Sequence, residues 1–157
     1  MDDAGASDRR RALAVLAFAA VAFVALLIFG LGVASLLLDQ AVNAEPGMSQ
    51  APGIAGTVVA TLGFVLVVWP ALRAKGGAGR AVLAALAAAF GYVAGFAAGA
   101  LGAGSDPFRA LAVAGALAVS WPPAVIAVAA LVSAAGALVA VRAEPGGARW
   151  PWEREED

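Results

Sequence analysis

The residues that could carry out chemistry are few in this sequence, and the types most often used for it are missing. The chain of 157 residues contains neither cysteine nor histidine. This excludes disulfides, a thiolate nucleophile, a zinc site of the usual cysteine and histidine kind, and the side chain that titrates most readily near neutral pH. A serine nucleophile would lack a credible base. We therefore expect a protein that is not an enzyme, with no catalytic residue and no cofactor.

Three acidic residues, Asp39, Glu45 and Asp106, fall between the apolar parts of the chain. Hard cations take carboxylate oxygens as ligands, so these acids are the candidates for a metal site. They have no regular ligand spacing, and we expect three solvated loop acids and no metal. A cation site or a membrane enzyme that uses these acids is the weakest alternative.

A glycine-rich stretch runs from Lys75 to Arg80 with the sequence KGGAGR. It lacks the G-x-x-x-x-G-K-[ST] spacing of a phosphate-binding loop, and no strand precedes it. We expect a flexible basic turn beside anionic lipid headgroups in place of a nucleotide site. Nucleic acid is not an expected partner either, because the basic residues lie at the edges of the apolar segments.

The elements that must position these residues are predicted to be membrane-spanning helices. Hydrophobic residues make up 62% of the chain and charged residues 13%, and the mean hydropathy is +0.89. Four tracts without charge each exceed the roughly 20 residues that cross a bilayer core as a helix. Lipid offers the backbone no hydrogen-bond partner, so each tract must satisfy its own N–H groups as a helix. The four tracts cover residues 12–38, 46–72, 81–105 and 110–141.

The predicted fold is therefore an all-α integral membrane four-helix bundle with both termini in the cytoplasm. A cleaved signal peptide is the alternative for the first span, but that apolar run is longer than the roughly 7 to 15 residues of a signal core. The predicted segments are a disordered cytoplasmic N-terminal segment at 1–11, spans at 12–38, 53–72, 81–103 and 110–141, outer loops at 39–52 and 104–109, a cytoplasmic loop at 73–80 and a cytoplasmic tail at 142–157.

The orientation follows from the distribution of the ten basic residues. Nine of them lie in the N-terminal segment, the 73–80 loop and the tail. Only Arg109 lies in the predicted outer loops. Basic residues near span ends are retained in the cytoplasm. A split of nine to one requires an even number of spans, and four is the even number that fits the tracts.

Small residues recur every fourth position along the third span, at Ala87, Gly91, Gly95 and Gly99. Residues four apart share one helix face, so this face lets another backbone approach closely. We expect it to pack against another span of the same chain. A seam between subunits is the alternative, and a pore lining is weaker because the stripe has no polar residue.

The fourth tract is too long for a straight span. Asp106 or Ser105 can cap a helix that has Pro107 at its first position. From Pro107 to Val141 a continuous helix would measure about 52 Å at 1.5 Å per residue. We predict a kink at Pro122 and Pro123, since each proline removes a backbone donor. The alternative makes 108–120 a re-entrant or interfacial piece and starts the span at Pro122.

No span contains an acidic or basic residue, which ion-driven transporters usually bury. The small multidrug transporters, which also have four spans, depend on such a glutamate, so that family is excluded. The polar residues inside the spans are expected to bond to helix carbonyls or across helix interfaces. They are Ser35, Thr57, Thr61, Tyr92, Ser120 and Ser133.

We expect a multi-pass protein of a plasma membrane that acts as a structural or accessory subunit through helix packing. Its expected partners are the lipid bilayer and either another membrane protein or further copies of itself. The alanine- and glycine-heavy composition suggests a bacterial source. The alternative is a transporter or channel for a small or apolar solute, with its pathway at an oligomer interface. Trp150 and Trp152 in the tail are expected to anchor at the headgroups, with a docking peptide as the alternative.

Overall fold

The structure, a computed structural model, describes residues 3–40, 50–74 and 77–142, and within these ranges the chain forms only α-helices. Four helices, α1, α2, α3 and α5, are long and apolar enough to cross a membrane, which confirms the predicted all-helical bundle. The fourth in chain order, α4, is too short to do so. The bounds are α1 Asp3–Leu38, α2 Ala51–Arg73, α3 Ala78–Gly102, α4 Pro107–Ala118 and α5 Trp121–Arg142.

The helix α1 begins earlier than the sequence suggested. The 1–11 segment was expected to be disordered, yet the described part of it, from Asp3 onward, is the first part of this 36-residue helix. Extending an existing helix costs little because each added residue gains one hydrogen bond. At its other end Asp39 takes a left-handed conformation with φ 51°, and the Gln40 N–H donates to the Ser35 carbonyl. This pair of features is a Schellman cap that stops the helix.

The helices α2 and α3 form an antiparallel hairpin. Pro52, expected in the preceding loop, lies in the first turn of α2, where a missing N–H costs no hydrogen bond. The helix α3 ends in a second Schellman cap, with Gly104 at φ 84° and the Ser105 N–H donating to the Ala100 carbonyl. Glycine suits this position because it has no Cβ to oppose a positive φ.

The predicted cap of the next helix is confirmed, and Asp106 rather than Ser105 provides it. One carboxylate oxygen of Asp106 accepts from the N–H groups of Phe108 at 3.0 Å and Arg109 at 3.2 Å. Pro107 occupies the first turn, where it is compatible with a helix start.

The single kinked helix that we favoured over 110–141 is not what forms. The helix is interrupted at Val119 and Ser120, so that the 12-residue α4 and the 22-residue α5 are separate helices. Pro122 and Pro123 fall in the first turn of α5, and neither can donate to a carbonyl of α4. The N–H and hydroxyl of Ser120 both donate to the Leu117 carbonyl instead, at 3.0 and 2.6 Å. The structure thus matches the alternative of a short piece followed by a span.

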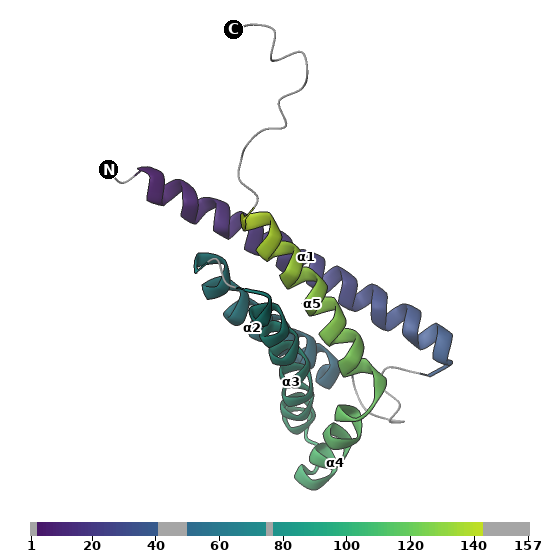
Figure 1. Ribbon diagram of the computed structural model, residues 1–157. Coiled ribbons are helices and arrows are strands. Elements are labelled where there is room, and N and C mark those ends of the chain that lie inside the picture. The colour runs from purple at the N-terminus through teal and green to yellow at the C-terminus, as the bar shows by residue number, and fades with distance from the viewer. Residues whose placement is uncertain (1–2, 41–49, 75–76, 143–157) are drawn as a thin grey trace, which may run out of the picture.

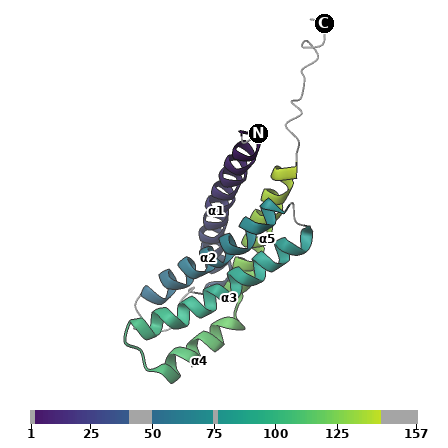
Figure 2. The ribbon, with the colours of Figure 1, turned by 90° about the vertical axis from the view of Figure 1, so that its left-hand side faces the viewer.

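Figures 1 and 2 show the arrangement of the helices. The hairpin of α2 and α3 packs closely, α5 lies along both α1 and α3, and α4 folds back beside α3. The long α1 reaches α2 through Phe23 and Phe64, whose rings stack with centroids 4.7 Å apart and an interplanar angle of 11°. Both rings are completely buried at the centre of the bundle.

The outside of the bundle is apolar. Large side chains such as Phe18, Leu66 and Phe90 are exposed over more than two thirds of their surface. A soluble protein of this size rarely exposes so much contiguous apolar surface. Lipid is the solvent that this exterior suits.

Candidate functional site

The predicted small-residue stripe of α3 faces α2 along its length. A Cβ added at Gly95 would lie 2.7 Å from the Ala55 carbonyl oxygen, and one at Gly91 would lie 3.0 Å from that of Val59. At Gly99 the nearest atom would be the Ala55 Cβ at 2.7 Å. Such contacts are closer than real side chains tolerate, so the absence of a Cβ is what permits this approach of the two backbones.

The helix α2 contributes small residues to the same contact. A Cβ at Gly63 would lie 2.9 Å from the Ala87 carbonyl oxygen, and one at Gly56 would lie 2.9 Å from that of Tyr92. The stripe therefore faces another span of this chain, and Gly95 is buried in that contact. Its contribution to folding stays a prediction, which a substitution at Gly95 can measure.

The polar residues inside the spans bond mainly within their own helices. Thr57 donates to the Gly53 carbonyl at 3.0 Å, and Thr61 donates to the Thr57 carbonyl at 2.8 Å. Such bonds satisfy a hydroxyl in lipid without any partner helix. Thr57 and Thr61 thus behave as expected for helix-packing residues.

Ser133 of α5 is the exception among these groups. Its side chain is only 6% exposed, and its hydroxyl has no hydrogen-bond partner within the described part of the chain. A buried hydroxyl without a partner costs about 1 to 3 kcal/mol, so such a group calls for an explanation. From the sequence we expected the Ser133 hydroxyl, like the others inside the spans, to bond to a helix carbonyl or across a helix interface. Nothing in its local sequence distinguishes it from them.

Ser133 lines an apolar groove between α1 and α5. The groove has a volume of about 430 Å³, and most of the side chains along it are small or aliphatic. Gly136 lies in it with open space where a Cβ would be, and Ala140 follows one turn later. On the α1 side the groove is bounded by Val15, Phe18, Ala19, Ala22 and Leu26. The sequence did not indicate this groove, because α1 and α5 are separated by about 80 residues or more.

The three predicted loop acids are not shown to form a site. Asp39 helps to end α1 and Asp106 caps α4, while Glu45 lies outside the described residues. Among residues 3–40, 50–74 and 77–142 no group of three or more acidic side chains is placed to hold a metal ion. The tail tryptophans Trp150 and Trp152, and Lys75 and Gly76 of the glycine-rich turn, also lie outside the described residues.

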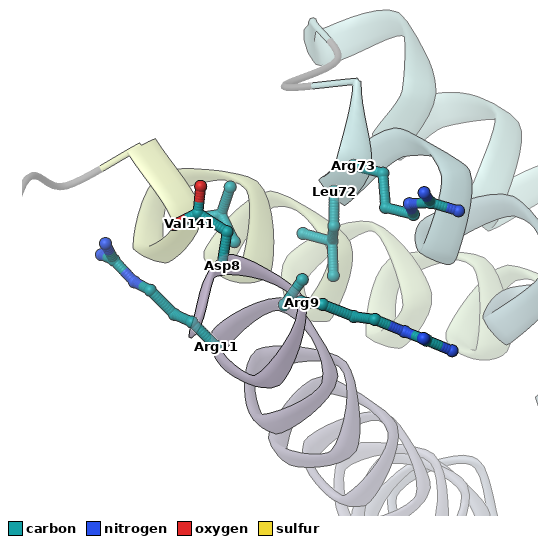
Figure 3. Close-up of a pocket in the computed structure, with 7 residues that line it drawn as sticks. Asp8, Arg9, Arg11, Leu72, Arg73 and Val141 are labelled. Carbon is teal, nitrogen blue, oxygen red and sulfur yellow. The ribbon is translucent and has the colours of Figure 1, made fainter. Parts of the chain in front are cut away.

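A second cavity, of about 270 Å³, lies where α1 passes the last turns of α2 and α5 (Figure 3). Arg9 and Arg11 of α1 and Arg73 of α2 line it, together with Asp8. Three guanidinium groups against one carboxylate leave a formal charge of +2 around the cavity. The sequence placed these arginines on one side of the membrane, and the structure brings them to one end of the bundle.

Each of two arginines is held by a contact of its own. Arg11 donates to the Ala140 carbonyl at 3.2 Å, which ties α1 to α5. The guanidinium carbon of Arg73 lies 5.7 Å from the centroid of the Trp69 ring, a cation–π distance. The arrangement can attract and orient an anion.

Comparison with known proteins gives a family but no activity. No curated protein and no solved structure matches the chain. Residues 6–157 match a family described as "Family of unknown function (DUF6121)". This match takes in all four long apolar helices and the short α4 between them. The chain therefore belongs to the family of unknown function DUF6121.

Proposed function

We propose that this protein is a structural or accessory subunit of a bacterial plasma membrane, and that it binds a transmembrane helix of another membrane protein in the groove between α1 and α5. The observation that carries the proposal is the apolar groove, in which Gly136 has open space where a Cβ would be and Ala140 is exposed one turn later. The alanine- and glycine-heavy composition supports the bacterial assignment.

A helix suits this groove better than a lipid chain does. Gly136 and Ala140 are small residues four apart that leave room for a backbone to approach, which is typical of helix interfaces in membranes. A neighbouring helix can supply a carbonyl or side-chain oxygen to the Ser133 hydroxyl only if this side chain rotates toward the groove, because its oxygen is buried in the structure. Interhelical hydrogen bonds of this kind contribute about 0.6 to 2 kcal/mol in membranes.

The remaining small-residue face supports the same assignment. The stripe of α3 is already occupied by α2, as the contacts of Gly91 and Gly95 show. A partner helix would therefore have to bind elsewhere, and the α1–α5 groove is a surface where small residues remain open. No observation on the described residues favours the transporter alternative over this one.

The test is affinity isolation in mild detergent with a variant that fills the groove. We expect Gly136→Leu to lose a membrane protein that wild type retains, because the added side chain occupies the space of the partner helix. Gly32→Leu is the matched control: Gly32 is exposed on α1, has open space around it and does not line the groove.

Two outcomes would contradict the proposal. One is recovery of the protein alone from native membranes. The other is a co-isolated protein that survives Gly136→Leu as well as it survives Gly32→Leu. Recovery of a second copy that depends on Gly136 would replace the accessory role with self-association.

A further inference from the structure

We infer that the basic cavity between α1, α2 and α5 binds the phosphate of an anionic phospholipid headgroup. This site is separate from the helix-binding groove, because the two share no lining residue. Arg9 of α1 and Arg73 of α2 both line this cavity.

The side chains of Arg9 and Arg73 extend to the same side of the cavity, whereas Arg11 extends the opposite way toward α5 (Figure 3). Arginine remains charged at any physiological pH, and its planar fork matches the oxygens of a phosphate. Two such groups on neighbouring helices can contact one phosphate together. Arginines that merely mark the cytoplasmic side need not line one cavity as these two do.

The floor of the cavity is apolar. Ala12 and Leu72 line it and are 8% and 2% exposed, and Val141 closes the α5 side. An inorganic anion gains nothing from such a floor, but the glycerol backbone and first methylenes of a phospholipid would cover it. The cavity thus combines arginine side chains with buried apolar residues in one lining, as a site for a headgroup and the start of its acyl chains requires.

The size of the cavity also fits a headgroup. Its volume of about 270 Å³ is just below the range of about 300 to 1,000 Å³ for pockets that enclose whole small molecules. A phosphate with its glycerol can enter while the acyl chains remain in the bilayer. Basic pockets between helices at a membrane face are suited to anionic headgroups of this kind.

Asp8 lowers the net positive charge of the cavity. It lies in the same lining, beside Val141 in Figure 3, and its carboxylate opposes an incoming anion. Removing this carboxylate should therefore tighten binding, the opposite direction to removing an arginine.

The experiment is native mass spectrometry of the full chain in detergent, titrated with phosphatidylglycerol, with phosphatidylcholine or with inorganic phosphate. We expect phosphatidylglycerol to bind wild type and to bind Arg9→Gln/Arg73→Gln at least ten-fold more weakly. Asp8→Asn should bind it more tightly. Circular dichroism of each variant will show whether the fold is intact, which we expect because Arg9 and Arg73 are exposed.

Arg10→Gln provides the control for net charge. Arg10 is exposed, adjacent to Arg9 and absent from the cavity lining, so its loss should change the affinity by less than two-fold. To match the charge of the double variant, Arg10→Gln/Arg80→Gln removes two positive charges that are also outside the lining.

Three results would overturn the inference. One is an equal loss of affinity in the Arg10→Gln/Arg80→Gln variant, which would indicate a general effect of positive charge. The second is equal binding of phosphatidylcholine and phosphatidylglycerol to wild type. The third is tight binding of inorganic phosphate with no preference for the lipid, which would assign the cavity to a soluble anion.

Discussion

At the scale of single residues, Gly95 is the position where a side chain is least tolerable. A Cβ there would lie within 3.0 Å of three atoms of α2, belonging to Ala55, Gly56 and Val59. Two of the three are backbone atoms that cannot move aside without shifting the helix. We expect Gly95→Ala to lower the free energy of unfolding by about 1 to 3 kcal/mol, the usual cost of overpacking.

The matched control is Gly32→Ala, near the C-terminal end of α1. No atom lies within 4 Å of the Cβ that it would add, so its main effect is to remove the conformational freedom of a glycine. It should leave the free energy of unfolding unchanged or raise it by up to about 1 kcal/mol. Denaturation in detergent micelles followed by circular dichroism measures both variants, and equal stabilities would show that the close approach of α2 and α3 contributes nothing.

The sequence predicted this stripe but not its partner. Spacing of four residues shows that Ala87, Gly91, Gly95 and Gly99 share a face. It is equally compatible with packing inside one chain and packing between two chains, because both kinds of contact need the same small residues. The distances to Ala55 and Val59 identify the neighbour, and no local pattern carries that information.

At the scale of elements, the start of α4 depends on one carboxylate. Asp106 accepts hydrogen bonds from the N–H groups of Phe108 and Arg109, which have no partner inside the helix. Loss of such a cap costs about 0.5 to 2 kcal/mol. With Asp106→Ala we therefore expect the first turn of α4 to exchange its amide hydrogens roughly 2 to 30 times faster, which is this cost converted to a ratio of rates.

Hydrogen exchange read by mass spectrometry on a peptide that covers Phe108 and Arg109 measures this effect. Asp106→Asn is the control, because its side-chain oxygen can still accept the same bonds and the exchange rate should stay near that of wild type. An exchange rate that Asp106→Ala leaves unchanged would mean that packing of Ala110 and Ala114 alone holds this turn.

The break after α4 shows why element boundaries were harder to predict than the elements themselves. Charge-free tracts and prolines indicated that 110–141 could not be one straight span, and Pro122 and Pro123 marked the place. Whether a helix bends at a proline or ends before it depends on whether the freed carbonyls find other donors. Here Ser120 supplies both of its donors to Leu117, a local bond that ends α4 and lets α5 begin at Trp121.

At the scale of the whole molecule, arginines that the sequence assigns to one side of the membrane also lie at one end of the bundle. The cavity lining shows that the first part of α1 lies beside the last turns of α2 and α5, so Arg9, Arg73 and Val141 meet at one end. The caps at Asp39 and Gly104 lie at the other ends of α1 and α3. What the sequence could not predict was which helices would be neighbours, because two residues as far apart in the chain as Arg9 and Arg73 can line one cavity without leaving a periodic signal.

The proposed orientation is directly testable because the chain contains no cysteine, so a single introduced cysteine is the only thiol to label. Gly77 and Ala103 are exposed and stand at opposite ends of α3, immediately before and after the helix. If basic residues are retained in the cytoplasm, Gly77→Cys faces inward and Ala103→Cys faces outward. We expect a membrane-impermeant maleimide to label Ala103→Cys in intact cells and to label Gly77→Cys only after the cells are permeabilised. The reverse pattern would put the basic cavity on the outer face, and equal labelling of both in intact cells would mean that α3 does not cross the membrane.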